Sequence, residues 1–319
     1  MPIRNPVAKQ IVEQTLRRFP NMPERAIARY LMANNKGVFS CEEHARSAIR
    51  NLNPERIALI KKRFKENGSM FSQVMKRPAY NLPFGSWGVL SDVHCPQHEP
   101  VALEAAFKFF KREKITGILI NGDFQDCEGV GFWPSIGKRD FLNEVELTID
   151  LLDFIRSEFP KVKIVYQAGN HEERLDRYYR QYAPMIADMP TAGLDIALGL
   201  EQRGVEYLER KQKIVAGKLT ILHGHEMRIS NTSVSPARSA LLKAKSCIAI
   251  GHFHRPSFHA SQTLEGKRIA AWSFGCLCNL SPDYNPYAND WEWGTAIIHH
   301  DKDGFEVDSR RIFENGKLH

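Results

Sequence analysis

Five short segments place histidine, aspartate and asparagine side chains directly after apolar runs. Imidazole and carboxylate groups together are typical ligands of divalent transition metals. The sequence therefore predicts a metal site, with enough ligands for a pair of ions. The segments are Asp92-Val93-His94, Asn121-Gly122-Asp123, Gly169-Asn170-His171-Glu172, His223-Gly224-His225 and Gly251-His252-Phe253-His254.

The apolar runs before these segments, rich in Val, Ile and Leu, are typical of buried strands. Ligands of α/β proteins gather at the carboxyl ends of strands, so we expect five strand ends to deliver the polar side chains to one edge of a sheet. Within Asp92-Val93-His94 and His252-Phe253-His254 the outer residues are two positions apart. In an extended chain both side chains would leave the same face.

In chain order, the motifs D-x-H, G-D, G-N-H-E, H-G-H and G-H-x-H resemble those of the calcineurin-like metallophosphoesterases, over about residues 86 to 275. One such motif is weak, but five in the right order, each closing a strand-like run, are specific. The resemblance implies an α/β fold, a four-layer αββα sandwich of two sheets with helices outside. It also implies a hydrolase that acts on phosphate esters.

The resemblance further implies two divalent metal ions that share one carboxylate, Asp123. Mixed imidazole and oxygen ligation without thiolate favours Mn²⁺, which we expect first, or Fe, Zn²⁺ or Ni²⁺. One ion would be bound by Asp92, His94, Asp123 and His254, and the other by Asp123, Asn170, His223 and His252.

By the same resemblance, two metals lower the pKa of a shared water so that hydroxide attacks the phosphorus in line. His171 matches the histidine that protonates the leaving oxygen. Asp126, three residues after Asp123, resembles the carboxylate that orients that histidine. For the histidines that are not at the ligand or acid positions of the motifs, a structural role is favoured; these are His98, His225, His259, His299 and His300.

The substrate is less directly indicated. Cys95 stands where the serine/threonine phosphatases have Gly, and the D-R-G arginine is absent after Asp123. The simpler motif pattern resembles repair nucleases and nucleotide phosphodiesterases. Aromatic and basic residues in two loops could hold a single strand by stacking, or could serve as packing. The loops are Gly131-Phe132-Trp133-Pro134 with Lys138-Arg139, and the stretch with Tyr284, Tyr287, Trp291 and Trp293.

Positive charge is concentrated in the amino-terminal quarter of the chain. Residues 1 to 80 hold 16 Lys and Arg against 6 Glu, a net charge of +10, whereas the whole chain has +7. A basic segment of this kind, with Lys61-Lys62-Arg63, is the footprint of phosphate contacts. DNA is the expected partner, ahead of RNA.

Periodicity predicts a small helical module over residues 1–67. We expect helices over 7–19, from Pro23 to about Asn34, from Ser40, and over 54–67. Ser40-Cys41-Glu42-Glu43 has the form of a capping box. The first three helices have the outline of a helix-turn-helix, with Arg46, Ser47 and Arg50 on the polar face of the third. Such modules also serve as protein docking pieces.

A mixed stretch with Gly and Pro, 68–85, predicts a linker, and 86–319 the catalytic domain. Within it we expect helices over 98–113 and 141–159, a largely helical stretch over 172–200 and strands over 205–223. Two hairpins should follow, 258–273 and 294–312. The first two helices belong to βαβ crossovers, which require parallel strands.

Composition is that of a globular protein: 43% hydrophobic and 25% charged residues. No apolar run approaches a membrane span, and the amino terminus has no signal core, so a cytoplasmic protein is expected. The six scattered cysteines predict reduced thiols that act as small apolar fillers, although Cys95, Cys276 and Cys278 also invite a metal interpretation.

These observations together predict a metal-dependent phosphodiesterase that cleaves DNA, guided by the amino-terminal module. One alternative is an enzyme for nucleotides or other small phosphoesters, with the module used for assembly. The other is a non-catalytic DNA-binding regulator with a vestigial metal site. A helical module joined to this catalytic domain also resembles phage and mobile-element genes.

Overall fold

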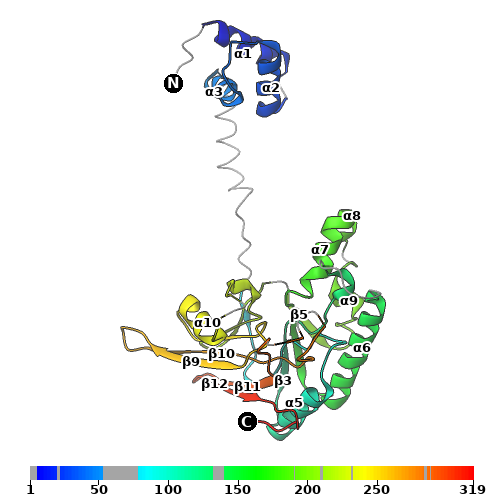
Figure 1. The fold of residues 1–319 in the computed structure, drawn as a ribbon. Helices are drawn as coiled ribbons and strands as arrows, with labels where there is room; N and C mark the ends of the chain where they lie inside the picture. Colours follow the sequence, from blue (N-terminus) through cyan, green and yellow to red (C-terminus); the bar gives the residue numbers. More distant parts are fainter. Residues whose placement is uncertain are drawn as a thin grey trace. The chain divides into compact units, whose positions relative to one another are not determined.

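The computed structural model describes residues 6–19, 22–52, 78–131, 140–189, 191–208, 211–230, 233–283, 286–287 and 289–319 (Figure 1). The chain divides into two compact units, Met1–Lys76 and Arg77–His319. Among the described residues, no helix combines the length and apolarity needed to cross a membrane.

The amino-terminal unit contains three described helices, α1 (Pro6–Arg18), α2 (Glu24–Asn34) and α3 (Glu42–Leu52), close to the predicted bounds. They bury a common apolar core that includes Val12, Ile27, Leu31 and Ile49. The predicted fourth helix, 54–67, lies outside the described residues. The helix-turn-helix interpretation stays a prediction.

The predicted capping box at the start of α3 is not formed. The Ser40 hydroxyl lies 3.2 Å from Nδ1 of His44. The Glu43 carboxylate accepts from Arg46 at 2.8 Å and from Arg50 at 3.1 Å. Two guanidinium partners are stronger donors than one backbone amide, so Glu43 turns along the helix and away from Ser40.

The second unit contains two six-stranded sheets, with the orders β1-β6-β7-β8-β10-β9 and β12-β11-β2-β3-β4-β5. The strands are β1 (Tyr80–Asn81), β2 (Gly85–Leu90), β3 (Gly117–Asn121), β4 (Lys163–Gln167), β5 (Val205–Leu208), β6 (Ile214–Ala216), β7 (Leu219–Leu222), β8 (Ile248–Ile250), β9 (Ser257–Gln262), β10 (Arg268–Ser273), β11 (Gly294–His300) and β12 (Phe305–Arg311).

The longer helices of this unit are α5 (Pro100–Arg112), α6 (Phe141–Glu158), α7 (Glu173–Tyr182) and α10 (Pro236–Ala244). Strands β2, β3, β4 and β5 pair in parallel, and α5 and α6 are the crossovers of the first two connections, as predicted. Both predicted hairpins, β9–β10 and β11–β12, are antiparallel pairs. Strand β1 lies within the stretch expected to be a linker, where it pairs with β6.

The layers follow from three apolar clusters. Residues of both sheets, among them Val89, Leu119, Ile221 and Ala249, form a core between the sheets. Another cluster buries α5 and α6 against one sheet, and a third buries α10 against β8 and β10 of the other. This is the predicted four-layer αββα sandwich (Figure 1).

The stretch 172–200 is helical in three pieces, not one. Helix α7 ends before Pro184, which begins the short α8 (Pro184–Ala187), and α9 (Leu194–Ala197) follows Gly193. Proline cannot donate the backbone hydrogen bond that a continuous helix requires.

Candidate metal centre

The predicted ligands follow strand ends of both sheets. Asp92 and Asp123 come directly after β2 and β3 of one sheet, and His223 and His252 after β7 and β8 of the other. The expectation that one sheet edge carries all of them was therefore wrong. The loops of the two packed sheets meet, as shown by the 3.1 Å between His223 Nε2 and Asp123 Oδ2.

The same-face argument for paired ligands was also wrong. Five predicted ligands have left-handed backbone, with φ of 54° at Asp92, 50° at His94, 50° at Asp123, 69° at His252 and 56° at His254. Residues with side chains rarely adopt this conformation, and it concentrates at functional sites. Tight turns, not extended chain, aim these side chains.

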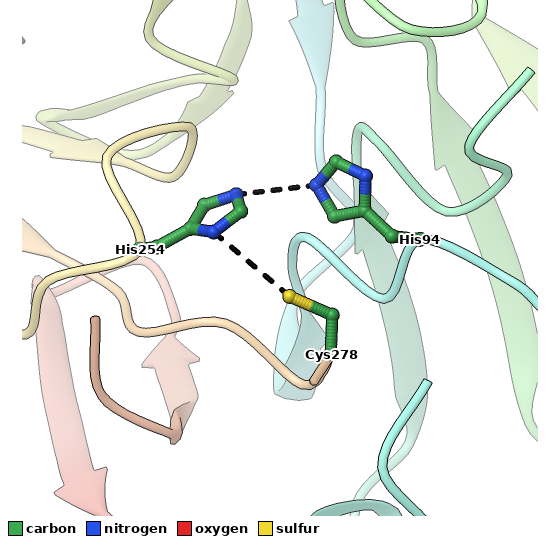
Figure 2. A group of neighbouring side chains, drawn as sticks. All are labelled: His94, His254 and Cys278. Carbon is green, nitrogen blue, oxygen red and sulfur yellow. Dashed lines mark hydrogen bonds between the residues drawn. The ribbon is translucent and has the colours of Figure 1, made fainter. Parts of the chain in front are cut away.

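One group of ligand atoms surrounds His254 (Figure 2). Nε2 of His254 lies 3.1 Å from Nε2 of His94 and 3.2 Å from Oδ1 of Asp92. On the other side of the ring, Nδ1 of His254 lies 3.9 Å from the Cys278 sulfur. All these side chains are buried.

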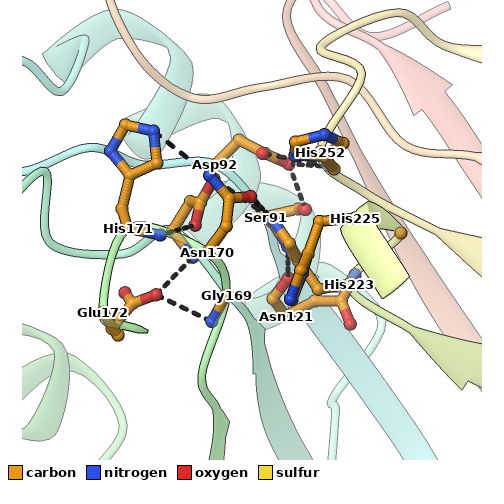
Figure 3. A network of polar contacts seen from close by, with 12 residues as sticks. Ser91, Asp92, Asn121, Gly169, Asn170, His171, Glu172, His223, His225 and His252 are labelled. Carbon is orange, nitrogen blue, oxygen red and sulfur yellow. Dashed lines mark hydrogen bonds and ion pairs between the residues drawn. The ribbon is translucent and has the colours of Figure 1, made fainter. Parts of the chain in front are cut away.

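A second group lies around His223 (Figure 3). Its Nε2 atom is 3.2 Å from Oδ1 of Asn170 and 3.1 Å from Oδ2 of Asp123. Its Nδ1 bonds the Asn121 carbonyl at 2.7 Å, which leaves Nε2 to face the site. His252 joins this group, with ligand atoms of Asp123, His223 and His252 within 4.8 Å of one another.

Asp123 is common to two groups. The same oxygen, Oδ2, lies 3.1 Å from His223 Nε2, 4.0 Å from His94 Nε2 and 3.9 Å from His171 Nε2. The other oxygen accepts the His171 backbone N–H at 2.9 Å. One oxygen of Asp123 therefore lies near a histidine of each predicted ligand set, His94 and His223.

His171 and Asp126 lie together as the sequence suggested. Nδ1 of His171 is 2.8 Å from Oδ1 of Asp126. That oxygen is also 2.9 Å from Nδ1 of His94, so Asp126 orients a predicted ligand as well. Burial favours the neutral acid, but the bonds from both imidazoles outweigh burial and lower the pKa of Asp126.

The residues fit a metal pair. Nδ1 of His252 is buried, and no hydrogen-bond partner for it occurs in the described part of the chain. Burial and the neighbouring His223 lower the pKa of His252 to about 4, so its ring is neutral and keeps a lone pair for a cation. Two imidazole nitrogens 3.1 Å apart, those of His94 and His254, likewise converge on one point.

Asp92 and His254 form an ion pair in the first group. Burial would raise the pKa of Asp92, but the charge of His254 lowers it to about 2. Burial would lower the pKa of His254, but the charges of Asp92 and then Cys276 raise it to about 10. A proton therefore occupies His254 at neutral pH.

Sequence reasoning gave Glu172 no role, although it closes the G-N-H-E motif. Its buried carboxylate accepts five hydrogen bonds from three segments of the chain. The G-N-H-E motif was the feature of the sequence that could have pointed to this residue. The donors are the backbone N–H groups of Gly169, Asp123, Phe124 and Gln125, at 2.7, 3.0, 2.7 and 3.2 Å, and the Tyr166 hydroxyl at 2.7 Å.

The two cysteines expected to be simple fillers, Cys276 and Cys278, are buried as expected, but they lie at the site. Cys278 contacts His254 (Figure 2), and the backbone N–H of Leu277 between them donates to the Asp92 carbonyl at 3.0 Å. Of the histidines expected to be structural, His225 borders the second group, with its ring centroid 5.4 Å from that of His223.

The predicted aromatic loops are only partly described. The Trp291 ring lies 4.1 Å, centroid to centroid, from that of His254, and Tyr287 is 85% exposed. Trp293 packs against the core and donates its indole N–H to the Cys278 carbonyl. Tyr284 and the stretch 132–139 lie outside the described residues.

A family model for the calcineurin-like phosphoesterases matches residues 87–284, more than half of the chain and every predicted site residue. The chain belongs to the calcineurin-like phosphoesterase family. Members depend on a dinuclear metal centre, and the family supports a hydrolase that acts on phosphate esters.

Two phage proteins are similar to this member of the family. The gene 54 protein of Mycobacterium phage L5 is 25% identical over 224 residues, which is 66% of this chain and 87% of the phage protein. The gene 54 protein of Mycobacterium phage D29 is 22% identical over 195 residues, 59% of this chain and 72% of its own.

Solved structures also match. The phosphoesterase Yfce from E. coli is 14% identical with a TM-score of 0.34, covering 73% of this chain and 96% of its own. A dimetal phosphatase from Danio rerio is 13% identical with a TM-score of 0.35, covering 72% and 96%. Scores this low add nothing to the family assignment.

Proposed function

We propose that this calcineurin-like phosphoesterase is a phosphodiesterase that cleaves DNA. The observation that carries the proposal is the aromatic side chain of Trp291 against the site residue His254, with the exposed Tyr287 four residues earlier. Aromatic side chains beside a phosphate-cleaving site offer stacking surfaces for the bases of a single strand. The net charge of +10 on residues 1 to 80 supplies attraction for a polyanion.

We assign two divalent ions, Mn²⁺ first, to the two groups of side chains, with Asp123 shared. When bound, such a pair activates a water for attack and neutralises charge on the phosphate. The chain itself sets where this happens, because the left-handed turns and the buried bonds of Asp92 and Asp123 position the ligand atoms. The remaining ligands are His94, Asn170, His223, His252 and His254.

His171 is the proposed general acid. Its Nδ1 is occupied by Asp126, so only Nε2 can reach a substrate, and this atom lies 3.9 Å from the shared Asp123 oxygen. A proton on Nε2 would pass to the leaving oxygen. Burial lowers the pKa of His171, but the charge of Asp123 and the bond to Asp126 outweigh it and leave the pKa raised, which favours the acid form.

A second function, hydrolysis of nucleotides or other small phosphoesters, is favoured by one observation. Arg46 and Arg50, the arginines expected to face nucleic acid, both pair with Glu24, at 2.9 and 3.0 Å, and with Glu43. Guanidinium groups engaged with carboxylates are less free to bind phosphates. In this case the module would serve assembly.

The test is hydrolysis with Mn²⁺ of bis-p-nitrophenyl phosphate beside labelled single- and double-stranded DNA. Wild type should cleave both kinds of substrate, and a chelator should abolish both activities. His171→Ala should lower kcat by about 10²- to 10⁴-fold, the range for loss of a general acid, with its metal content unchanged by elemental analysis.

Cleavage of the small diester without cleavage of DNA would reject the nuclease and favour the second function. Equal DNA cleavage by full-length protein and residues 81–319 at all salt concentrations would reject guidance by the module. Retention of activity in His171→Ala would reject the assigned acid. Absence of activity in metal-loaded wild type would favour a non-catalytic regulator.

A further inference from the structure

The positively charged side chain of Arg174 lies beside His171, the proposed general acid. Arg174, on the first turn of α7, donates from Nη2 to Nε2 of His171 at 2.8 Å and from Nη1 to the carbonyl of Asp126 at 3.0 Å. Helix α7 begins at Glu173, and the buried Leu175 fixes this turn against the core. Arg174 is therefore held at the site by the same turn that carries His171.

The guanidinium of Arg174 forms no ion pair with a carboxylate within the described ranges. Its two bonds go to a ring nitrogen of His171 and to the carbonyl of Asp126, and neither acceptor is a carboxylate. On the next turns of the same helix the arrangement differs, because Arg180 pairs with Asp176 at 3.1 Å and with Asp188 at 3.6 Å. The positive charge of Arg174 is left available for an anion.

The bond between Arg174 and His171 cannot persist when a substrate is in place. Guanidinium is a donor only, and it uses the one atom of His171, Nε2, that faces the site. The proposed reaction requires that atom to bond the leaving oxygen of the ester. Arg174 Nη2 then loses its acceptor, and the oxygens of the bound phosphate are acceptors at the same place.

We propose that Arg174 is a substrate-binding residue that moves from His171 Nε2 to an unesterified oxygen of the phosphate group. This rests on the proposed function through the role of His171. Arginine is suited to the task because its planar fork forms strong, charge-assisted bonds to phosphate. The contact recognises the phosphate itself, so it applies to DNA and to small diesters alike.

The test compares Arg174→Gln, Arg174→Lys and the matched control Arg177→Gln, an exposed arginine three residues further along α7. Four quantities are measured: kcat and KM for bis-p-nitrophenyl phosphate, the affinity of the Mn²⁺-loaded protein for inorganic phosphate by calorimetry, and metal content. Arg174→Gln should weaken phosphate binding about 10- to 100-fold, as for removal of a charge-assisted bond. KM should rise more than kcat falls.

Arg174→Lys should recover part of the phosphate affinity because it keeps the charge. Arg177→Gln should match wild type, and all variants should keep wild-type metal content. Phosphate affinity unchanged in Arg174→Gln, or no phosphate binding by wild type, would overturn the proposal. Loss of metal in Arg174→Gln would also overturn the proposal, because Arg174 would then have a structural role in the turn that carries His171 and not a role in binding phosphate.

The phosphate titration separates this proposal from the proposed function. If wild type cleaves only the small diester, or nothing, the nuclease fails, yet the calorimetric comparison still decides whether Arg174 binds phosphate. If DNA is cleaved and Arg174→Gln behaves as wild type throughout, the nuclease stands and Arg174 has no part in it.

Discussion

The carboxylate of Glu172 is the acceptor that joins the turn after β3 to the turn after β4. Its donors are four backbone N–H groups and the hydroxyl of Tyr166, all of them buried around the site. A carboxylate can accept all of these bonds, whereas an amide presents one oxygen and one donor group. Glu172 thus holds in place the turns that carry Asp123 and Asn170, although Glu172 itself is not a predicted metal ligand.

We therefore predict that Glu172→Gln destabilises the fold and loosens the site. The amide N–H₂ would face N–H donors, and the free energy of unfolding should fall by about 3 kcal/mol, as for buried donors left without an acceptor. Urea unfolding measures this, and Mn²⁺ affinity should fall as well. Glu146→Gln, at an exposed position of α6, is the control; equal stability of the two variants would refute the prediction.

His254 contributes to the pH dependence of metal binding, together with His223, whose pKa burial would lower but the charge of Asp123 raises well above its usual value. The His254 pKa of about 10 means that the metal-free protein carries a proton on this ring at about pH 8. The ion pair between protonated His254 and Asp92 stabilises the fold fully below about pH 6.5. This contribution to the free energy of unfolding is lost as the pH rises through about 10. A metal ligand must be unprotonated.

Mn²⁺ binding at about pH 8 should therefore release about one proton from His254, and affinity should rise with pH. Calorimetry in buffers of different ionisation enthalpy counts the protons. His254→Asn should release about one proton fewer than wild type. Binding that releases none in wild type would contradict the assignment of His254 as a ligand.

At the scale of elements, the turns after the strands carry the site. Gly122 ends β3 with φ of +83°, and a Cβ there would lie 2.4 Å from Nδ1 of His223, a ring that belongs to the other sheet. Gly169 is similar, since its Cβ would lie 2.2 Å from Oδ1 of Asp123. These glycines are needed because backbone and ligand side chains approach closely there.

Gly122→Ala should consequently lower the free energy of unfolding by at least about 1 kcal/mol, for the positive φ alone. The displaced His223 should also weaken Mn²⁺ binding. Thermal unfolding and a metal titration measure both effects. Gly304→Ala, in the β11–β12 turn with open space around the Cβ, is the comparison. If both variants behave alike, close packing at Gly122 is unimportant.

At the scale of the whole molecule, charge is divided unequally along the chain. Residues 1 to 80 have a net charge of +10, although the whole chain has only +7. Electrostatic attraction of DNA by the basic segment would be screened by salt, whereas hydrolysis of a small diester at the metal site would depend on salt much less. The two activities should therefore respond differently to ionic strength.

We predict that DNA affinity of the full chain falls steeply with salt. Replacing Lys61, Lys62 and Arg63 by Gln should reduce the slope of log affinity against log salt by about 1 for each DNA phosphate that these side chains neutralise. Fluorescence anisotropy at several NaCl concentrations measures the slope, with bis-p-nitrophenyl phosphate hydrolysis as the control. An unchanged slope would show that these residues do not bind DNA.

Much of this protein was readable from the sequence by itself. The helices, the parallel strands and the hairpins follow from apolar periodicity and turn residues, which are local properties of the chain. The αββα architecture was implied by the family resemblance that the ordered motifs carry. The ligand types were also readable, because each predicted ligand stands in a short motif directly after a strand. Pro184 shows the limit, because the sequence predicted a largely helical stretch over 172–200 without the break that this proline makes.

Only the tertiary structure decided how distant segments meet. It placed the site across the loops of two sheets, turned five ligands into left-handed backbone, and brought Arg174 to Asp126 and Arg46 to Glu24. It also gave Glu172 its donors, three of them 47 to 49 residues away along the chain. Sequence spacing reports which residues are local neighbours, whereas these contacts arise when sheets and helices pack, and that packing depends on the whole chain at once.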